Sequence, residues 1–444
     1  MPRRRLLVAL LLAAACARQP PVTGPPLRVG TSGDYPPFSL ERDGREDGFD
    51  LAVARRYARD RGRRLEVVRF RWPDLVANLR SGRFDVAMSG VTMRAERAAA
   101  GWYTRPVVET GAVVITRPAL ASTPEEVDRR GVRLAVNRGG HLEAVARRRF
   151  PDAALTLVDD NRELGALLAT GGADAVVSDG LEARWVVEQA GETVVLGPLT
   201  HDRKAYLAAD AALAADLDAW LRDRDDDGWL ADRRREWFGT TPFEPASAFD
   251  SDLSALVAFV DLRLAFMPAV AAAKAAARLP LADARREAAV LAAARDAATA
   301  RGLDAAAVED LFEVQIAAAR EAQKTFLRLP PDRRGRVAAL DLAREARPGI
   351  ARVSETIVAR AADVAAHRTA LLAVEPKRIA GRLDATFVPI RERRRIAAAI
   401  LALRCAGPPC TPLVGLSYGA GRCAPPCSPS VFSPPSRSTP PTSA

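Results

Sequence analysis

The sequence predicts a multidomain protein in which a two-lobed α/β domain is followed by an all-α helical bundle. Its 444 residues, 48% of them hydrophobic, are too many for one compact core and suggest two or three domains. Short apolar strand segments alternate with helical segments over residues 27–240, which is the order expected of an α/β fold. After FEPASAF at 243–249 the strand signals stop, and Ala-rich helical periodicity takes over for residues 247–370.

Two successive sets of strands and helices make up the α/β part. The first set runs from LRVGTS at 27–32 through LEVVRF at 65–70 to FDVAMSG at 84–90. The second set begins with VRLAVNRGG at 132–140, and the chain then returns through KAYLAA at 204–209. We therefore expect two lobes, joined by two strands, with a cleft between them that can close on a small ligand.

The net charge of +10 does not point to a nucleic-acid partner. Of the 65 basic residues 61 are Arg, and they lie beside Asp and Glu or among Ala rather than in a basic stripe with stacking aromatics. We therefore expect no binding to nucleic acid. A chain that avoids Lys is expected to keep it where chemistry needs it, which draws attention to Lys204, Lys274, Lys324 and Lys377.

The N-terminus predicts export from the cytoplasm. Arg3, Arg4 and Arg5 precede an apolar segment at 6–15 and then small residues, so residues 1–22 are interpreted as a signal peptide rather than a buried helix. Cys16 stands where a lipoprotein cysteine would stand. After the signal no uninterrupted apolar run reaches the ~18–20 residues of a membrane span. The expected location is periplasmic, with membrane contact only through a lipid on Cys16.

Residues 371–444 are predicted to be a basic and then Pro- and Ser-rich tail without ordered structure. RERRRIAAAILALR at 391–404 is either a basic amphipathic helix that touches anionic surfaces or sequence beyond the functional end, and we favour the second. Apart from Cys16 the cysteines all lie in this tail, so the folded body is expected to need no disulfide. Metal binding is not expected, and disulfides stay an alternative, for Cys405, Cys410, Cys423 and Cys427.

The first part of the chain resembles a family of exported binding proteins. TSGDYPPFSLERDGREDGFDLAVARRYA at 31–58 and FDVAMSGVTMRAER at 84–97 resemble the periplasmic solute-binding proteins for polar amino acids. RWPDL at 71–75, SDGLEAR at 178–184 and KAYL at 204–207 resemble the cyclohexadienyl dehydratases, which are catalytic relatives of those transport proteins. The resemblance implies a type 2 periplasmic-binding-protein fold, and a reaction in which prephenate or arogenate loses its ring hydroxyl together with CO2.

The resemblance also implies a dehydratase site between the lobes. Glu182 is implied as the general acid that protonates the leaving hydroxyl, a role that requires a raised pKa in an apolar cleft. Arg97 can grip a substrate carboxylate with two hydrogen bonds, and Asp179 matches the position that holds a ligand amino group. The other implied substrate-binding residues are Asp34, Trp72, Ser89, Thr92, Asn137, Gly139, Gly140 and Lys204.

Several of these residues also have an interpretation without function. Arg97 near a helix start and Glu182 in a first helical turn are often solvated surface groups. Gly139 and Gly140 can hold an anion at a helix N-terminus, or they can simply form a turn between strand and helix. His141 stands where the dehydratases tend to have a small hydroxylated residue. The choice of substrate between prephenate and arogenate therefore stays open.

Charged and polar residues recur on the helices of the bundle, which we place at 251–278, 282–301, 304–328 and 335–369. Arg263 and Lys274 are eleven residues apart, which is three turns along about the same face. Gln323 lies among apolar neighbours in the third helix. Taken one at a time, such residues are more often part of a solvated surface. Spacings of three and four residues also place on one face Asp283, Arg286 and Glu287.

Taken together, these positions resemble the all-helical chorismate mutases, specifically their exported subclass. The similar segments are LVAFVDLRLAFMPAVAAAKAAARLPLADARREAAVL at 256–291 and VQIAAAREAQKTF at 314–326. The resemblance implies a pocket inside the bundle in which Lys274 and Gln323 address the ether oxygen of chorismate. Ala319 departs from the usual Ser or Thr.

The remaining roles in that pocket follow from the same resemblance. Arg263 and Arg286 are implied to lie near the substrate carboxylates, and Glu287 to take the ring hydroxyl. Asp283 is a weaker candidate for substrate binding, and Arg347 in ARPGI matches an arginine that the exported subclass supplies from its own chain. Fixed cations would hold the folded dianion while donors meet the charge that grows on the ether oxygen.

The two resemblances support each other, because one reaction makes what the other consumes. We therefore expect a bifunctional enzyme that converts chorismate to prephenate and prephenate to phenylpyruvate, or arogenate to phenylalanine, outside the cytoplasm. Neither reaction needs a metal or an organic cofactor, so none is expected. The main alternative is an amino-acid-binding receptor of a transporter fused to a helical mutase or structural module. Oligomeric state stays open.

Overall fold

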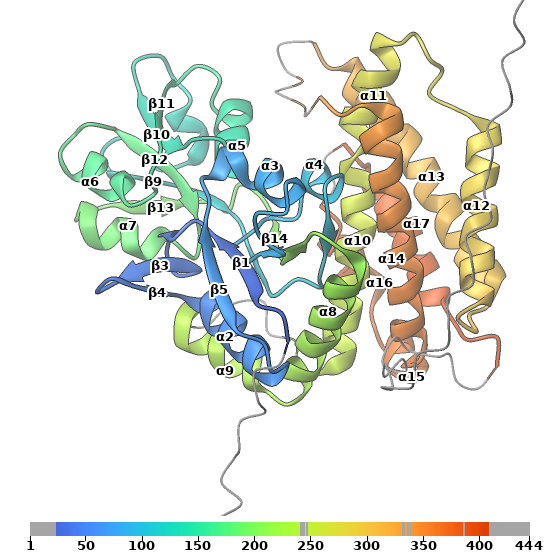
Figure 1. The fold of residues 1–444 in the computed structure, drawn as a ribbon. Helices are drawn as coiled ribbons and strands as arrows, with labels where there is room; N and C mark the ends of the chain where they lie inside the picture. Colours follow the sequence, from blue (N-terminus) through green and yellow to red (C-terminus); the bar gives the residue numbers. More distant parts are fainter. Residues whose placement is uncertain are drawn as a thin grey trace, which may run out of the picture.

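The computed structural model describes residues 24–239, 245, 247–330, 334, 337, 339–384 and 387–407. The predicted signal peptide, Cys16 and residues 408–444 lie outside the described residues. An α/β part, blue to green in Figure 1, packs side by side with a helical bundle, yellow to orange. The predicted fold class, a two-lobed α/β domain followed by an all-α bundle, is confirmed.

The first lobe is built on a five-stranded sheet with the strand order β5-β1-β6-β15-β7. β1 runs parallel to β5 and β6, whereas β15 returns from the far end of the α/β part and pairs antiparallel with β6 and β7. The strands are β1 (Leu27–Thr31), β5 (Leu65–Arg69), β6 (Val86–Ala87), β7 (Trp102–Tyr103) and β15 (Leu207–Ala208). A small antiparallel sheet joins β2 (Asp34–Tyr35), β3 (Ser39–Arg42) and β4 (Arg45–Asp47). The helices of this lobe are α2 (Phe49–Asp60), α3 (Leu75–Arg80), α4 (Ala95–Ala98), α8 (Ala211–Asp226) and α9 (Trp229–Phe238).

The second lobe repeats the arrangement with the order β11-β10-β12-β9-β13. Its strands are β9 (Ala112–Thr116), β10 (Arg133–Asn137), β11 (Ala154–Val158), β12 (Ala175–Asp179) and β13 (Val194–Leu196). Its helices are α5 (His141–Arg149), α6 (Glu163–Ala169) and α7 (Ala183–Ala190). Two short strands, β8 (Val108–Thr110) and β14 (Asp202–Lys204), pair antiparallel where the chain crosses between the lobes, and we call them the hinge strands.

The bundle begins with α10 (Ala248–Ala265), capped by Ser247, whose side chain accepts from the backbone N–H of Asp250. The first predicted helix is in fact split: Pro268, in the first turn of α11, has no N–H to continue the ladder of α10. The last predicted helix starts later than residue 335, with a π-helical turn at Leu342–Ala346 that leads into α14. The helices are α11 (Met267–Ala276), α12 (Ala284–Thr299), α13 (Ala305–Arg328) and α14 (Arg347–Ala365).

Helix α10 lies at the junction of the two parts and is buried on all sides. The stretch Ala248–Ala276 is long and apolar enough to span a membrane, which the run-length reasoning missed. However, 78% of its most apolar window is buried inside the protein, against α8 and α4 of the first lobe and against α13 and α14 of the bundle. It is therefore the central core helix of a two-part fold, as Figure 1 shows between the green and orange segments.

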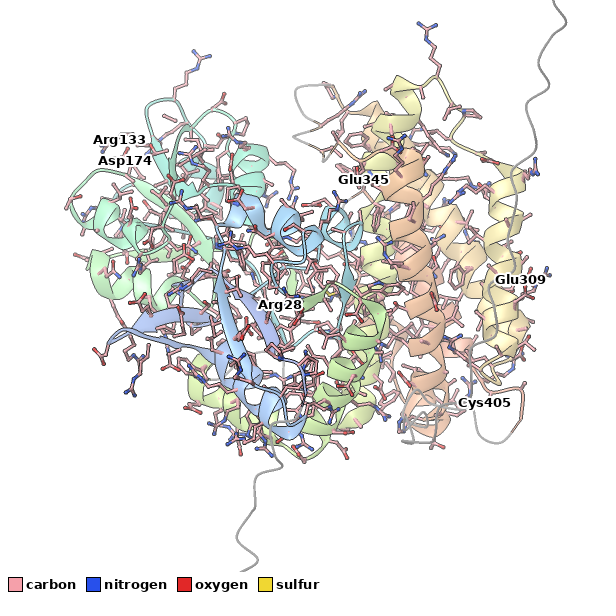
Figure 2. The ribbon with its side chains drawn as sticks, in the orientation of Figure 1. Arg28, Arg133, Asp174, Glu309, Glu345 and Cys405 are labelled. Carbon is pink, nitrogen blue, oxygen red and sulfur yellow. The ribbon has the colours of Figure 1, made fainter. Side chains whose placement is uncertain are left out.

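The prediction that the chain loses order after residue 370 is wrong for residues 371–384 and 387–407. α15 (Arg368–Leu372) is followed by α16 (Pro376–Arg382) and α17 (Ile390–Ala402), and α17 packs against α13 and α16. Ile396 and Ile400 of α17 are fully buried, so its apolar face belongs to the bundle core and not to a membrane surface. Cys405, at the lower end of the bundle in Figure 2, is disulfide-bonded. The remaining three tail cysteines lie outside the described residues.

A buried network of charges holds the two parts together. Arg105 of the first lobe pairs with Asp218 of α8 at 3.0 Å and with Asp252 of α10 at 3.2 Å. Arg360 of α14 reaches the same Asp218 at 2.6 Å, and Arg222 pairs with Asp252 at 2.9 Å. All of these side chains except Arg222 are almost fully buried. Each buried charge has lost its hydration and is stabilised by its ion-pair partners instead.

We predict that Arg105→Met lowers the free energy of unfolding by about 3 kcal/mol or more, because it leaves two buried carboxylates short of a cation. Urea denaturation followed by tryptophan fluorescence measures the change. Arg235→Met is the matched control, because it removes an ion pair with Asp232 in which both side chains are 63% exposed, and it should change stability little. Equal effects of the two substitutions would contradict the role given to the buried network.

Candidate active sites

The cleft between the lobes gathers most of the predicted dehydratase residues around one small cavity of about 20 Å³. Trp72, Thr92 and Arg97 reach it from the first lobe, Asn137 and Gly140 from the second, and Lys204 from a hinge strand. The lobes are closed on each other, since the backbone N–H of Asn161 in the second lobe donates to Asp34 in the first at 3.3 Å. A substrate must therefore enter by opening of the lobes.

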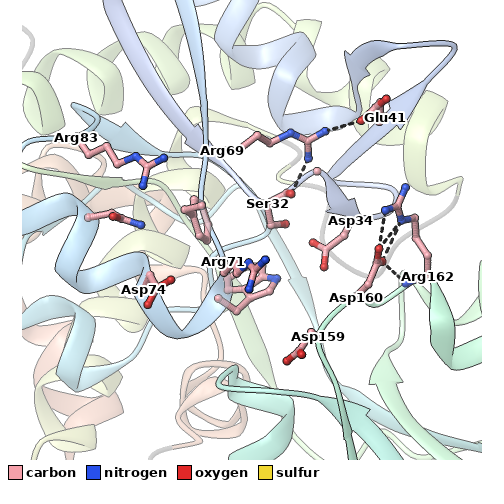
Figure 3. A pocket seen from close by; sticks show the side chains of 14 residues that line it. Ser32, Asp34, Glu41, Arg69, Arg71, Asp74, Arg83, Asp159, Asp160 and Arg162 are labelled. Atoms are coloured by element: carbon pink, nitrogen blue, oxygen red, sulfur yellow. Dashed lines mark hydrogen bonds and ion pairs between the residues drawn. The ribbon is translucent and has the colours of Figure 1, made fainter.

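Outside this cavity the cleft widens into a polar mouth of about 620 Å³, shown in Figure 3. Asp34 points into the mouth, between the Arg69–Glu41 pair on one side and the Arg162–Asp160 pair on the other. Trp72 lines both the mouth and the small cavity. The predicted residues Asp34 and Trp72 thus lie on the path by which a ligand would reach the interior.

Arg97 is buried in the cleft and does not lie on the surface. Its Nη1 donates to the carbonyl of Thr92 at 2.9 Å, and its guanidinium lies 5.6 Å from the ring centre of Trp72. Burial lowers the pKa of Arg97, which means that the charged form lacks part of its solvation. A substrate carboxylate would supply the counter-charge that this environment favours.

Lys204 joins the lobes inside the cleft. Its Nζ lies 3.0 Å from Asp179 of the second lobe and donates to Thr92 Oγ1 of the first lobe at 2.9 Å and to the Tyr35 hydroxyl at 3.1 Å. Asp179 also accepts from Thr110 Oγ1 at 2.8 Å and from the backbone N–H of Leu181 at 2.9 Å. The position expected to hold a substrate amino group is therefore already occupied by the chain's own ammonium group.

Glu182 sits just after β12 at the start of α7 and is 1% exposed. Burial raises the pKa of Glu182 well above its usual range; the hydroxyl of Ser178, which donates at 2.6 Å, opposes the rise, and Asp179 and Asp34 add to it. Burial therefore favours the protonated form of this carboxyl group. Glu182 is not among the residues lining the closed cavity, but it lies near Tyr35, which does line it, so that a Glu182 carboxylate would raise the pKa of the Tyr35 hydroxyl.

Two other predicted residues are engaged in local structure. Ser89 Oγ pairs with the hydroxyl of Ser32 at 2.9 Å, beneath the cleft. The backbone N–H of Gly139 donates to Glu143 at 2.6 Å, so a first-turn carboxylate of α5 takes the place that an anion was expected to take. Gly140 is the residue before α5 and lines the cavity.

The residues that sequence reasoning missed lie mainly around His141. Its Nδ1 is 3.0 Å from Arg94 of the first lobe, and its Nε2 is 2.8 Å from Asp202 of a hinge strand. Burial lowers the pKa of His141, although Asp202 opposes this effect. Both ring nitrogens are used, so His141 bridges lobe and hinge and is not a free donor, and only the fold brings its partners together.

Several buried polar atoms around the cleft have no hydrogen-bond partner within the protein. They are Trp72 Nε1, Asn137 Nδ2, Asp34 Oδ1, Asn161 Oδ1 and Asp179 Oδ2, the last of which is ion-paired with Lys204. Buried polar groups are nearly always paired in folded proteins, so unpaired groups that converge on a cleft indicate a polar ligand or water there.

The helical bundle gathers all seven predicted mutase residues around a second pocket of about 110 Å³. These residues are Arg263, Lys274, Asp283, Arg286, Glu287, Gln323 and Arg347. In that order, the first two lie on α10 and α11, the next three at the start of α12, one on α13 and one at the start of α14. Helical spacing alone had placed several of them on common faces, and the folded bundle turns those faces toward one another.

Arg263 is the deepest cation in this pocket. Its Nε donates to Ser354 Oγ at 3.1 Å, its guanidinium lies 5.5 Å from the ring centre of Phe312, and its buried Nη1 has no hydrogen-bond partner. Burial alone lowers the pKa of Arg263 to about 10, so the group is still a cation at neutral pH. An unpaired, desolvated guanidinium is suited to a carboxylate ligand.

Lys274 and Gln323 supply hydrogen-bond donors. Lys274 Nζ donates to the carbonyl of Leu281 at 2.6 Å. Burial lowers the pKa of Lys274, although the nearby carboxylates of Asp283 and Glu287 oppose this effect. Gln323 Nε2 donates to the carbonyl of Ala319 at 3.1 Å, while its buried Oε1 has no partner. Both side chains line the pocket, where their nitrogen atoms are the donors available to a substrate oxygen.

The acidic residues of the pocket have structural partners as well. Asp283 caps α12 by accepting from the backbone N–H of Arg286 at 3.1 Å, which explains its position without a substrate. Glu287 pairs with Arg320 at 3.4 Å. The pocket is thus lined by the two acidic residues Asp283 and Glu287 and by five basic residues. The basic residues are Arg263, Lys274, Arg286, Arg320 and Arg347. In the described residues no group of His, Cys, Asp and Glu is arranged to hold a metal ion.

Comparisons with known proteins match the two parts separately. Residues 27–240 match the bacterial extracellular solute-binding proteins, family 3, and residues 254–324 match chorismate mutase type II. The cyclohexadienyl dehydratase of Pseudomonas aeruginosa is 34% identical over 219 residues, which are 48% of this chain and 82% of that protein. The L-cystine-binding protein TcyJ of Escherichia coli is 26% identical over 48% of this chain and 82% of its own length.

Among solved structures, an ancestral amino-acid-binding protein described as a precursor of cyclohexadienyl dehydratase matches 48% of this chain and 96% of its own, with 28% identity and a TM-score of 0.46. The mutase match includes Arg263, Lys274, Arg286 and Gln323 and ends before Arg347. The chain is therefore an enzyme that belongs to family 3 of the bacterial extracellular solute-binding proteins, with a dehydratase-like two-lobed domain joined to a type II chorismate mutase domain.

Proposed function

We propose that the chain converts chorismate to prephenate in the helical domain and prephenate to phenylpyruvate in the two-lobed domain, outside the cytoplasm. The observation that carries the second step is Glu182, a carboxyl group buried beside the cleft against Ser178 with its pKa raised by burial, because a protein that only binds amino acids needs no acid there. The observation that supports the first step is the pocket in the bundle that five basic residues line. Export rests on the first 22 residues and on the extracellular family.

The dehydratase step is an elimination that makes the ring aromatic. The bond between the ring and its carboxylate breaks, CO2 leaves, and the electron pair moves through the ring to expel the hydroxyl group. Glu182 donates its proton to that hydroxyl, so water leaves and Glu182 becomes a carboxylate until it regains a proton. Arg97 grips a substrate carboxylate, and the closed lobes exclude water from the reacting ring.

The arrangement around Asp179 favours prephenate over arogenate. The side chain of prephenate ends in a keto acid, whereas that of arogenate carries an ammonium group that would need a carboxylate partner. Asp179 Oδ2 is already ion-paired with Lys204 at 3.0 Å, and Asp179 Oδ1 accepts two hydrogen bonds. An incoming ammonium group would have to displace Lys204 and separate it from its counter-charge.

The mutase step needs no proton transfer and no covalent intermediate. Arg263, Arg286 and Arg347 surround the pocket and can hold the two carboxylates of chorismate in the folded conformer. As the carbon–oxygen bond breaks, negative charge grows on the ether oxygen, where Lys274 and Gln323 can donate. One well-placed donor of this kind is worth on the order of 3 kcal/mol of barrier.

We predict that Glu182→Gln lowers kcat for phenylpyruvate formation from prephenate by about 10²–10⁴-fold, because the amide cannot protonate the leaving hydroxyl. Glu188→Gln, on the exposed side of the same helix, is the matched control and should change little. Absorbance of phenylpyruvate reports the rate with prephenate. Phenylalanine released from arogenate is measured beside it, and arogenate should be the poorer substrate. An active Glu182→Gln variant would remove Glu182 as the acid.

The two activities are predicted to differ in pH dependence. The dehydratase needs protonated Glu182, whose pKa is raised, so its rate is present below that pKa and falls as the pH rises through it. The mutase relies on Gln323, which does not titrate, and on Arg263, which stays charged up to a pH of about 10. Its rate should therefore be nearly flat between about pH 5 and pH 8.

The substitution Gln323→Glu tests this directly. A glutamate must be protonated to donate to the ether oxygen, so the variant should keep its mutase rate in acid and lose it as the pH rises. The unmutated mutase, measured over the same pH range, is the control. A steep acid limb in the unmutated mutase, or a flat profile in Gln323→Glu, would count against the proposed role.

A further inference from the structure

The hinge strands of the two-lobed domain present one face to the cleft and the other to the helical part of the chain. On β14, Asp202 and Lys204 point toward the cleft. There Asp202 contacts His141, and Lys204 contacts both Tyr35 and Thr92. Arg203 lies between them and, by the alternation of side chains along a strand, points the other way. Glu109 is the residue paired with Arg203 on β8, with the two side chains 3.3 Å apart.

Both of these central hinge residues are held by groups from outside the two-lobed domain. Arg203 Nη1 pairs with Asp261 of α10 at 2.8 Å. Glu109 Oε1 accepts from Arg382 of α16 at 2.7 Å, and Arg382 also donates to Ser254 Oγ of α10 at 2.8 Å. Arg203 donates in turn to the carbonyl of Arg382. The helical part therefore contacts both hinge strands at their midpoints.

A second set of bonds closes this arrangement into a ring. Asp384 donates its backbone N–H to Asp261 at 3.0 Å and accepts from the backbone N–H of His201 at 3.3 Å. His201 pairs with Glu109 at 2.9 Å. Arg203 is 5% exposed and Glu109 9% exposed. Although burial opposes ionisation, His201, Arg203 and Arg382 hold the pKa of Glu109 well below its usual range.

The ring restricts how the lobes can move. Opening of a two-lobed domain turns one lobe against the other by twisting the strands that connect them. Such a twist would carry Glu109 and Arg203 away from Asp261 and Arg382, which are fixed in the bundle, and would break buried ion pairs. The same strands carry Lys204, which touches Thr92 of the first lobe and Asp179 of the second.

We propose that Asp261 and Arg382 are positioning residues for the dehydratase site: from the helical part of the chain they hold the hinge strands so that Lys204 meets both lobes in the closed cleft. This inference rests on the proposed dehydratase function. It gives the segment after the mutase match, which contains α16, a task in the other domain's reaction. It also makes the helical part necessary for full dehydratase activity.

The test uses the full mature chain with Asp261→Asn and with Arg382→Gln. Each variant should lower kcat/KM for prephenate about tenfold, with the loss mainly in kcat, because Lys204 and Glu182 are misplaced relative to the substrate. Chorismate mutase activity in the same molecules should stay within about twofold, which shows that the chain is folded. Amide hydrogen exchange should quicken in the hinge strands at 108–110 and 202–204. Arg382→Lys, which keeps a cation near Glu109, should recover part of the loss.

Arg80→Gln is the matched control. Arg80 pairs across the same junction with Glu345, labelled in Figure 2, at 2.8 Å but does not touch the hinge, so its loss should leave prephenate turnover unchanged. Unchanged prephenate kinetics and unchanged hinge exchange in both test variants would overturn the inference, and so would a parallel loss of both activities. If the unmutated chain does not turn over prephenate, the proposed function fails instead, while hinge exchange still decides whether the ring holds the strands.

Discussion

Charged side chains that are buried without a full set of partners determine what both sites can do. Arg263 keeps an unpaired Nη1 in the bundle, Arg97 lies 5.6 Å from the ring centre of Trp72 in the cleft, and burial raises the pKa of Glu182. The buried guanidinium groups of Arg263 and Arg97 are costly without a counter-charge, and a ligand carboxylate relieves that cost. The proposed substrates are dianions, so they supply these counter-charges, and the surrounding fold must be rigid enough to keep the guanidinium groups in place until a substrate binds.

Much of the mutase site could be predicted from sequence because a helix fixes the angle between residues. Arg263 and Lys274 share a face by spacing, and the known family supplied the pairing of that face with Gln323 across the bundle. The cleft was harder. Glu182 and Lys204 could be named from the family's motifs, but the contacts of His141 with Arg94 and Asp202 join segments far apart in the sequence. No local pattern reports such contacts.

The C-terminal segment shows where composition misled the prediction. The many Arg residues of 391–404 and the Pro-rich sequence beyond suggested a tail without order, yet Ile396 and Ile400 are buried against the bundle, and Arg393 donates to two backbone carbonyls, of Val388 and Leu383. In a chain this rich in Arg, basic residues are weak evidence for exposure. A functional form of the protein should therefore extend through residue 407, because it would otherwise lose α16, α17 and the contact of Arg382 with the hinge.

Whether one chain carries both activities is tested by supplying the purified mature chain with chorismate alone, at neutral pH, and following chorismate, prephenate and phenylpyruvate over time. Prephenate should rise and then fall while phenylpyruvate accumulates, since one chain carries both sites. Complete conversion to prephenate, with phenylpyruvate no faster than in a protein-free control, would contradict it. The two-lobed domain would then be a receptor, and the next measurement would be which ligand it binds.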